Sequence, residues 1–173
     1  AMRGAKEIHI TAPAGTAIVV PVMNREPMSD DGDFTKPESG GNIPAGEVFI
    51  SPVVGTGKGT GCQGKIVYDG SITLNSKDII IHNPIEVCVK DGFVVSIKNV
   101  NPVTNGEESE ADQLLDTITQ AETRALQMEK NGKLPIGSGA VYAKNARNIG
   151  ELGIGLNPEA AITGNMLEDE KAF

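Results

Sequence analysis

The sequence is poor in aromatic residues, cysteine and histidine, and it contains no tryptophan. Aromatic residues make up 3% of its 173 positions, and there are two cysteines and two histidines. A core with so few rings must be built from Val, Ile, Leu and Ala. Cys62 and Cys88 form no Cys-x-x-Cys pair, so they predict buried free thiols rather than a disulfide or a zinc site.

Positive charge and long apolar runs are also scarce. Fifteen basic residues against 23 acidic ones leave a net charge of −8, and phosphate binding needs a basic surface, so nucleic acid is not expected as a partner. No apolar run approaches the roughly 18 residues of a membrane span, and no signal peptide is recognisable at the start. We therefore expect a cytoplasmic protein without a membrane partner. Ala1 before Met2 resembles the remnant of an expression tag.

Glycine and proline, by contrast, are frequent, at 21 and 10 residues. Many turns favour a β-rich chain, and the length suits one domain over residues 1–173. We predict an α+β fold, a β-rich domain of antiparallel hairpins with one long amphipathic helix packed on the sheet. Period-two alternation, apolar runs and turn residues place the strands. They are expected at residues 6–11, 17–22, 48–50, 65–68, 71–74, 86–89, 93–97 and 152–155, the last of them buried.

The long helix is predicted from Glu107 to Lys130, where apolar residues recur at helical spacing. Asn105 and Glu108 have the spacing of a capping box, and Gly132 marks the end. A further helical turn is expected at 166–171. The charged outer face of the long helix, residues 107–130, is typical of a solvated surface, so this helix is assigned to packing against the sheet.

Two loops invite ligand-binding interpretations that the spacing does not support. Residues 55–61 are rich in glycine, but Lys58 is followed by Gly59 and then by a strand, whereas a phosphate loop needs Ser or Thr and a helix. We read this segment as a flexible connector that passes near the site. Residues 24–40 carry clustered acids, Asp30, Asp31 and Asp33, without the spacing of a calcium loop. They predict a solvated loop.

Glu47 is the most informative single residue. It follows a loop rich in Gly and Pro and directly precedes the apolar run Val48-Phe49-Ile50. A carboxylate at such a loop-to-strand junction is held by rigid backbone and suits a metal ligand or an acid/base group. The plainer alternative is a solvated residue at a strand edge.

Two segments resemble the aminopeptidase T family of metallopeptidases. The stretch Asn42-Ile43-Pro44-Ala45-Gly46-Glu47-Val48-Phe49 is similar to the family's metal-binding Asn-Leu-Pro-x-x-Glu-Val-Phe segment. Residues 146–152, which include Gly150-Glu151, resemble its later Gly-Glu segment. The resemblance runs from about Arg3 to Phe173. It implies a segment of a hydrolase, a leucyl aminopeptidase that removes N-terminal residues from peptide substrates.

The resemblance also implies a metal site. Glu47 and Glu151 would be metal ligands for divalent ions (zinc, cobalt or magnesium), two of them in a complete site, in a protein that forms a homodimer. No catalytic residue is assigned. The family's remaining ligands, a His, a Tyr and a His-x-Asp pair, and its preceding α/β domain have no counterpart here. The chain would then hold half a metal site and by itself hydrolyse little or nothing.

Two other functions stay open at this point. One is a non-catalytic β-rich structural or dimerisation module, in which the edge of the Lys90-Asp91-Gly92 hairpin pairs between subunits. The position of Glu47 relative to Glu151 discriminates the two, since metal ligands must face one cleft. Phosphate binding by residues 55–61 is the weakest alternative.

Overall fold

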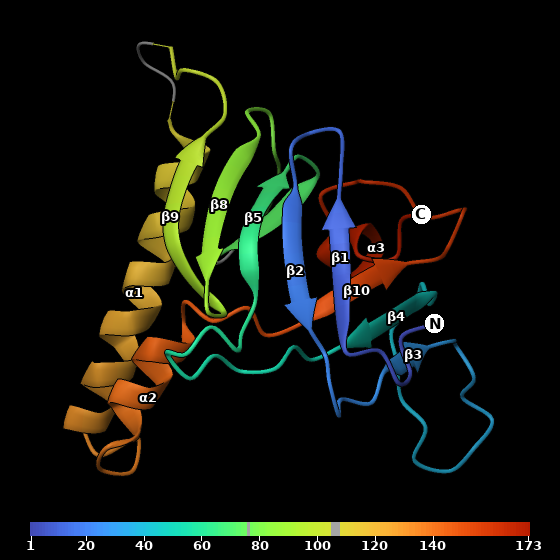
Figure 1. Cartoon of the computed structure of the whole chain (residues 1–173), viewed down its shortest axis with the longest axis horizontal. Coiled ribbons are helices and arrows are strands. Elements are labelled where there is room, and N and C mark those ends of the chain that lie inside the picture. Colours follow the sequence, from blue (N-terminus) through green and yellow to red (C-terminus); the bar gives the residue numbers. More distant parts are fainter. Residues whose placement is uncertain (76, 105–107) are drawn as a thin grey trace.

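A five-stranded antiparallel sheet forms the main layer of the computed structural model, which describes residues 1–75, 77–104 and 108–173 (Figure 1). Its order is β1-β2-β5-β8-β9, so that β5 joins an N-terminal hairpin to a later one. The tight Asp91-Gly92 turn connects β8 and β9, as predicted. The strands are β1 (Glu7–Thr11), β2 (Ala17–Pro21), β5 (Gln63–Tyr68), β8 (Ile85–Lys90) and β9 (Phe93–Asn99).

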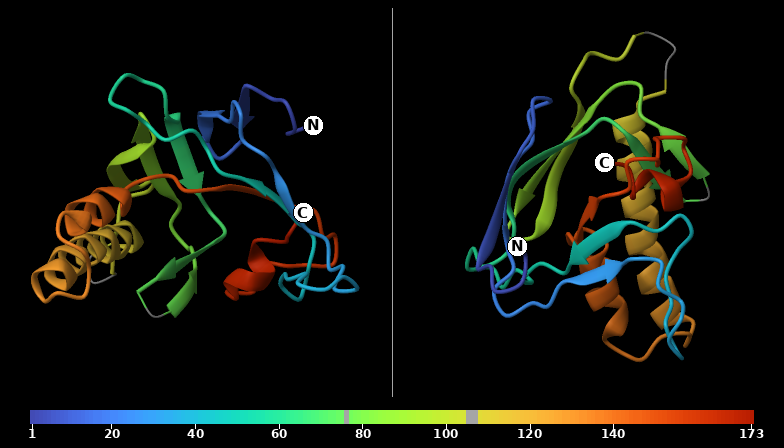
Figure 2. Two further views of the ribbon diagram at one scale, coloured as in Figure 1. Left: turned by 90° about the horizontal axis from the view of Figure 1, so that it is seen from below. Right: turned by 90° about the vertical axis from the view of Figure 1, so that its right-hand side faces the viewer.

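A smaller sheet and a hairpin lie against one face of this layer. The smaller sheet has the order β10-β4-β3, from β10 (Leu152–Gly155), β4 (Glu47–Ile50) and β3 (Met28–Asp30). The hairpin pairs β6 (Ser71–Leu74) with β7 (Lys77–Ile80). The left view of Figure 2 shows both of them, together with the helices, on the same side of the large sheet. β3 and β7 were not predicted, and β3 falls within the segment expected to be a loop.

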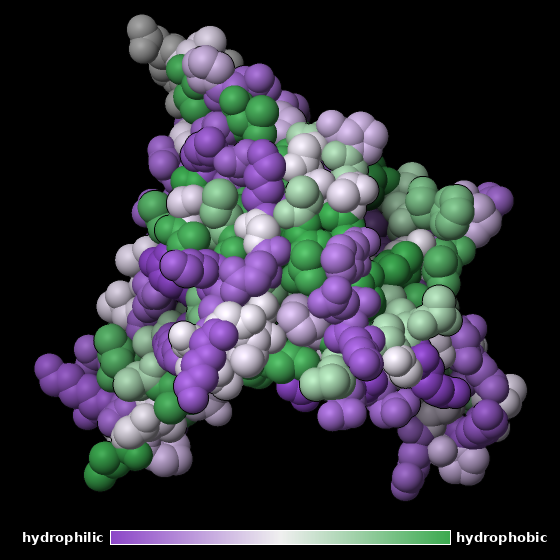
Figure 3. Space-filling view, in the orientation of Figure 1, coloured by the Kyte–Doolittle hydropathy of each residue, from purple (hydrophilic) through white to green (hydrophobic). Residues whose placement is uncertain are grey.

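Alternation along the strands builds the core. Ile18, Val20, Val87 and Val89 point to the covered face and are buried, where they meet Ile50 of the smaller sheet. The opposite face carries charged side chains, with Lys65 and Lys98 bonded to Glu86 across neighbouring strands at 2.8 and 3.0 Å. In Figure 3 hydrophilic and apolar groups are interspersed over the face turned to the viewer. Cys62 is fully buried, Cys88 is half-buried, and both are free thiols, so full burial is confirmed for Cys62 alone.

The long helix α1 (Glu110–Lys130) packs against β9 and against α2 (Ser138–Asn145), which was not predicted. The Ser109 hydroxyl caps α1 by accepting the Asp112 N–H at 3.0 Å. The predicted start at Glu107 and the capping box through Asn105 lie outside the described residues. α3 (Met166–Asp169) confirms the expected helical turn.

These elements confirm the α+β fold dominated by antiparallel strands. β10 forms where expected, but Ile154 is 40% exposed, so the strand is not buried as predicted. Among the described residues, no helix combines the length and the apolar character that crossing a membrane requires. That residues 1–173 form one domain stays a prediction.

Candidate acidic site beside an apolar cavity

Glu47 lies at the start of β4, in the middle of the smaller sheet. It is directly opposite Asp30 of β3 on one side and Gly155 of β10 on the other. The Gly46 N–H donates to the Asp30 carbonyl at 2.8 Å, and the Leu156 N–H donates to the Gly46 carbonyl at 2.8 Å. Glu47 is 7% exposed. It is therefore an interior residue held from both sides, and the alternative of a solvated edge residue is wrong.

A buried lysine lies beside the two opposed carboxylates and offsets one of their two negative charges. Asp30 and Glu47 are each 7% exposed, and like charges facing each other across strands destabilise a sheet. The Lys171 ammonium, which is 0% exposed, donates to Glu47 Oε2 at 2.9 Å and lies 3.7 Å from Asp30 Oδ2. It also bonds to Glu170 Oε1. Burial pulls the pKa of Lys171 down, but its hydrogen bonds to Glu170 and Glu47 outweigh burial and raise that pKa.

Asp30 has one carboxylate oxygen left over. Oδ2 accepts the Asn42 N–H at 3.0 Å. Oδ1 is buried and accepts no hydrogen bond from any residue that the structure describes. Gly41 lies against this oxygen, and a Cβ at that position would be 3.2 Å from Asp30 Cγ. The backbone at 41–42 therefore approaches the carboxylate as closely as glycine permits, which explains a glycine there.

Glu151 reaches the same site along a segment anchored to the large sheet and to α1. Arg147 donates twice to Glu122 of α1, at 2.6 and 3.1 Å. The Ile149 N–H then donates to the Gly92 carbonyl at 2.8 Å, and the chain continues through Glu151 into β10. Glu151 is an exposed residue at the rim of the site; partial desolvation raises its pKa, and the negative charges of Glu47 and Glu170 raise it further.

The glycine-rich segment 55–61 supports this anchor and is not a loose connector. The Gly61 N–H donates to Asp91 Oδ1 at 2.8 Å, and the Gly57 N–H donates to Asp91 Oδ2. The hydrogen bond from Gly61 is the main reason that the pKa of Asp91 is lowered. Residues 55–61 thus hold the Asp91-Gly92 turn, to which Ile149 is bonded. Their backbone N–H groups bind a carboxylate of the protein itself, which accounts for the glycines without a phosphate ligand.

Two cavities meet at Glu151. The acidic one measures about 300 Å³ and is lined by Asp30, Glu47, Glu151 and Glu170. The other, also about 300 Å³, lies between the covered face of the large sheet and β10. Its lining is mostly apolar and includes Ile10, Ile18, Val20, Ile66, Tyr68, Ile149 and Leu152. Glu47 and Glu151 therefore face one cleft, and Glu151 also borders a compartment suited to an apolar or aromatic group.

Sequence reasoning missed Asp30, Glu170 and Lys171. Asp30 was assigned to a solvated loop, yet it is buried, whereas Asp31 and Asp33 are exposed as expected. The signal available in the sequence was the charge pattern, because Lys171 follows three consecutive acids in a helical turn. Such a pattern is ordinarily interpreted as a solvated face. Only the pairing of β3 with β4 brings Asp30 to Glu47, and no local pattern predicts it.

The donor set fits a divalent cation in part. Carboxylate oxygens suit hard and borderline cations, and Asp30, whose Oδ1 accepts no hydrogen bond from the described residues, lines the acidic cavity. The two histidines lie elsewhere, His9 bonded to Glu7 at 2.7 Å and His82 to Glu110 at 3.2 Å. Within residues 1–75, 77–104 and 108–173, no group of three or more His, Cys, Asp or Glu side chains is arranged to hold a metal ion.

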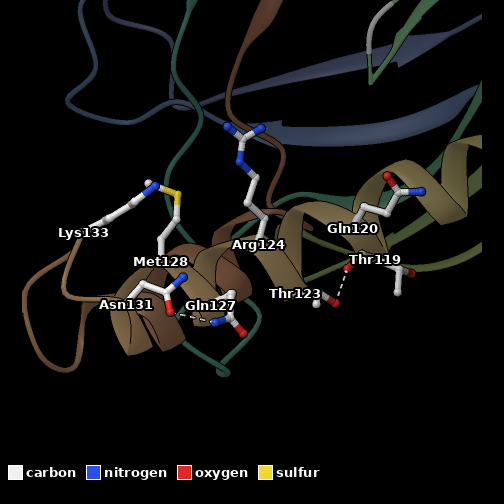
Figure 4. A pocket seen from close by; sticks show the side chains of 8 residues that line it. All are labelled: Thr119, Gln120, Thr123, Arg124, Gln127, Met128, Asn131 and Lys133. Atoms are coloured by element: carbon white, nitrogen blue, oxygen red, sulfur yellow. Dashed lines mark hydrogen bonds between the residues drawn. The ribbon is translucent and has the colours of Figure 1, made fainter.

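A larger cavity of about 480 Å³ follows the outer surface of α1, away from these carboxylates. Figure 4 shows Arg124 pointing out from the helix and Lys133 extending toward Met128. Several polar groups that line this groove are already hydrogen-bonded: Thr123 donates to the Thr119 carbonyl and Gln127 donates to Asn131, both at 2.9 Å. The acidic cleft is the better candidate site, because it is lined by both predicted site residues, Glu47 and Glu151, and the groove on α1 is lined by neither.

Comparison with known proteins identifies a family. The family model described as NicX, 2,5-dihydroxypyridine 5,6-dioxygenase, matches residues 1–173. A solved structure of a 2,5-dihydroxypyridine dioxygenase from Pseudomonas putida KT2440 superimposes with a TM-score of 0.65 at 22% identity. The superposition covers 99% of this chain and 43% of that one, so the chain spans less than half of that protein's length. No curated protein matches in sequence.

These matches correct the functional expectations. The resemblance to aminopeptidase T was wrong, because the family model that covers the whole chain is that of an oxygenase and not of a hydrolase. Peptide substrates and the function of a leucyl aminopeptidase are therefore withdrawn. The non-catalytic structural module finds no support either, because the matched family is enzymatic. A metal cofactor remains compatible with a ring-opening dioxygenase. The homodimer stays a prediction.

Proposed function

We propose a dioxygenase function on the premise that this chain belongs to the NicX family of 2,5-dihydroxypyridine 5,6-dioxygenases. The single observation that carries the proposal is the family match over residues 1–173. The reaction in the family's name inserts both atoms of O₂ while the ring bond between carbons 5 and 6 breaks, so a ring-opened acid forms without a separate reductant. The substrate class is accordingly a hydroxylated N-heteroaromatic ring.

The two cavities that meet at Glu151 are the proposed binding site for the ring. A flat ring suits the apolar cavity, whose volume of about 300 Å³ is at the small end of ligand sites, which span about 300–1,000 Å³. A ring seated there brings a hydroxyl group toward Glu151, which borders both cavities. Tyr68 lines the same cavity, and burial raises the pKa of its phenol, which keeps it a neutral hydrogen-bond donor. These groups would orient the ring and exclude water from it.

We further propose that Glu47 and Glu151 supply carboxylate ligands to a divalent metal ion. Both line the acidic cavity, at the end of the apolar one. A divalent ion bound there would polarise the substrate's hydroxyl oxygen and bring it together with O₂. Glu47 is fixed by Lys171 at 2.9 Å, so its carboxylate is oriented before any ligand enters. The experiment below also determines which of iron, cobalt, zinc and magnesium supports activity.

The experiment measures O₂ uptake and loss of 2,5-dihydroxypyridine absorbance with the longest product of the gene and with the 173-residue chain. Each metal is supplied in turn, with a chelator as control. Glu47→Gln and Glu151→Gln should each lower the rate at least about tenfold, the loss expected when a positioned charged group is removed from a reacting site. Glu159→Gln, an exposed acid outside both cavities, is the matched control.

The outcomes separate the parts of the proposal. Incorporation of two ¹⁸O atoms from ¹⁸O₂ into one ring-opened product supports a dioxygenase. A folded full-length product that consumes no O₂ with any hydroxypyridine and any of the metals would refute the function. Full activity in both glutamate variants would refute the assigned site and leave the function standing. We also propose a cytoplasmic location, because both cysteines are free thiols, as expected in a reducing compartment.

A further inference from the structure

Asp91 carries a buried charge that the proposed chemistry does not use. It lies in the turn between β8 and β9 and is 9% exposed. Among the described residues, no lysine, arginine or histidine forms an ion pair with it. Backbone N–H groups of residues 55–61 hold its carboxylate instead, with Gly61 bonded to one oxygen at 2.8 Å and Gly57 to the other. Such converging N–H groups form a nest, which fixes an anion without a cation.

The backbone of the nest packs directly against the backbone of Asp91. A Cβ on Gly55 would overlap the Asp91 carbonyl oxygen, and a Cβ on Gly61 would lie 2.6 Å from the Asp91 carbonyl carbon. Backbone atoms cannot turn aside as the end of a flexible side chain can. The β8–β9 turn is therefore seated in one position by both the carboxylate and the main chain of Asp91.

This turn joins the two walls of the apolar cavity. The floor of the cavity is the covered face of β1, β2 and β5, and the roof is residues 149–153. In the left view of Figure 2 the orange segment that leads into β10 runs along the covered face of the large sheet. β5 follows the nest in sequence, and the Gly92 N–H donates to the Cys62 carbonyl at 2.9 Å. The Gly92 carbonyl accepts the Ile149 N–H at 2.8 Å, so one residue of the turn bonds to both walls.

The roof has a second attachment at its other end, where Leu152 pairs with Ile50 of β4. Glu151 therefore lies between two attachments, one to the β8–β9 turn and one to the smaller sheet. A shift of the turn would move Ile149 and change the height of Glu151 above the floor. Coupling of this kind passes through a continuous series of bonded and packed segments.

We infer that Asp91 is a positioning residue that sets the height of the roof and thereby the size of the ring that the apolar cavity admits. This inference rests on the part of the proposed function that places a ring in that cavity. Asp91 lines neither cavity, so it acts through Ile149 and Glu151 without touching the ring. The volume of about 300 Å³ suits a single ring, and a roof free to rise would also admit two fused rings.

The test compares a one-ring probe, 2-hydroxypyridine, with a fused two-ring probe, 2-hydroxyquinoline. Binding of each probe to the longest product of the gene is measured by titration calorimetry without O₂. Wild type should prefer the one-ring probe. Asp91→Ala should reduce that preference at least about tenfold, since fit in an apolar pocket discriminates one extra group by about 10–200-fold. Asp116→Ala removes an exposed carboxylate of α1 outside both cavities and should keep the wild-type preference.

Two further variants perturb the same contact in different ways. Asp91→Asn keeps a side-chain oxygen that can accept the Gly61 N–H, so its preference should lie closer to wild type than that of Asp91→Ala. Gly61→Ala displaces the turn from the opposite side and should also reduce the preference. The double variant Asp91→Ala and Gly61→Ala should add little to the larger single effect, because both changes break one contact. If Asp91→Ala fails to fold, Asp91→Asn and Gly61→Ala decide the question by the same comparison.

Hydrogen exchange of the Ile149 N–H reports the position of the roof directly. Its exchange should be at least about tenfold faster in Asp91→Ala and in Gly61→Ala, because the loosened segment opens more often. The amides of β1, at the far edge of the large sheet, should keep their wild-type rates. This contrast distinguishes a loosened roof from a general loss of stability.

Each remaining outcome has a defined meaning. An unchanged probe preference in folded Asp91→Ala, or exchange that accelerates equally in β1 and at Ile149, would overturn the inference. Failure of both probes to bind wild type would overturn it together with the proposed place of the ring. The expected shift in a protein that consumes no O₂ would reject the dioxygenase function and leave this inference standing. An active dioxygenase whose probe preference does not depend on Asp91 would reject the inference alone.

Discussion

Replacing Gly153 with alanine tests how tightly the acidic site is packed. Gly153 lies in β10, and a Cβ there would be 3.4 Å from Glu47 Cδ and well inside contact distance of Glu47 Oε1. The oxygen would have to move by about 1 Å to reach ordinary van der Waals separation. It cannot move freely, because the other carboxylate oxygen is bonded to Lys171 at 2.9 Å.

The cost follows from this restraint. Overpacking a fixed interior typically costs about 1–3 kcal/mol, and we expect about 2 kcal/mol for Gly153→Ala. For a domain of this size, each kcal/mol lowers the melting temperature by about 2–4 °C, so the expected decrease is about 4–8 °C. Differential scanning fluorimetry and far-UV circular dichroism measure it.

Gly150→Ala is the matched control. Gly150 lies three residues earlier, and a Cβ there would meet no described atom within 4 Å. It should change the melting temperature by less than about 1 °C, as surface substitutions usually do. Equal melting temperatures for the two variants would refute the reasoning, because they would show that Glu47 yields without cost and is not held by Lys171.

Three further predictions concern the framework of the site. Burial raises the pKa of Glu110, but hydrogen bonds led by the Asn83 N–H outweigh it and lower that pKa below 4.5, so the ionised form stabilises the fold. Glu110→Gln should lower the free energy of unfolding by about 1–2 kcal/mol at neutral pH. The difference from wild type should vanish as pH falls through the lowered pKa of Glu110. Thermal melts from pH 7 to 3 measure it, and a difference that stays constant with pH would contradict the prediction. Ile85→Ala, at a fully buried core position, should cost about 2–5 kcal/mol in urea unfolding, and a smaller loss would mean that the core collapses around the cavity. Gly64 has a φ of +133°, and a Cβ there would lie 2.8 Å from the Ile18 backbone. Gly64→Ala should therefore cost at least about 1–3 kcal/mol in urea unfolding. Unchanged stability would rule out the β2–β5 register, in which Gly64 lies opposite Ile18.

Local sequence patterns predicted the strands of the large sheet better than they predicted the site. The alternation in β1 and the Asp91-Gly92 turn are encoded by neighbouring residues, and both were found where expected. β3 is three residues long within a polar segment, too short for periodicity to detect. The order of the strands, which puts β5 between β2 and β8, is set by burial of the sheet's inner face and not by any single turn.

The candidate site could be predicted only in part, because its residues come from distant segments. Glu47 was identified by its place at a loop-to-strand junction and Glu151 only by the resemblance of residues 146–152 to a family segment, and both line one cleft. The reaction class was assigned wrongly, because it came from the resemblance to aminopeptidase T and short carboxylate-containing segments occur in enzymes of different reaction classes, whereas the metal-ligand role of the two residues stays a prediction. Lys171 was missed because its partner Glu47 is 124 positions away, and nothing in a four-residue acidic turn shows that its lysine is buried.

The bond between Glu47 and Lys171 has a consequence for the order of folding. Contacts that close long stretches of chain form slowly, because the entropy of loop closure is lost before the contact contributes. The β8–β9 hairpin and α1 depend on neighbouring residues and can form early, whereas the acidic pocket needs residues 30, 47 and 171 together. During synthesis the pocket therefore closes only after Lys171 has left the ribosome. A nascent chain that has not yet reached Lys171 would hold the paired acids of β3 and β4 without their cation, so the smaller sheet depends on synthesis of residues up to 171.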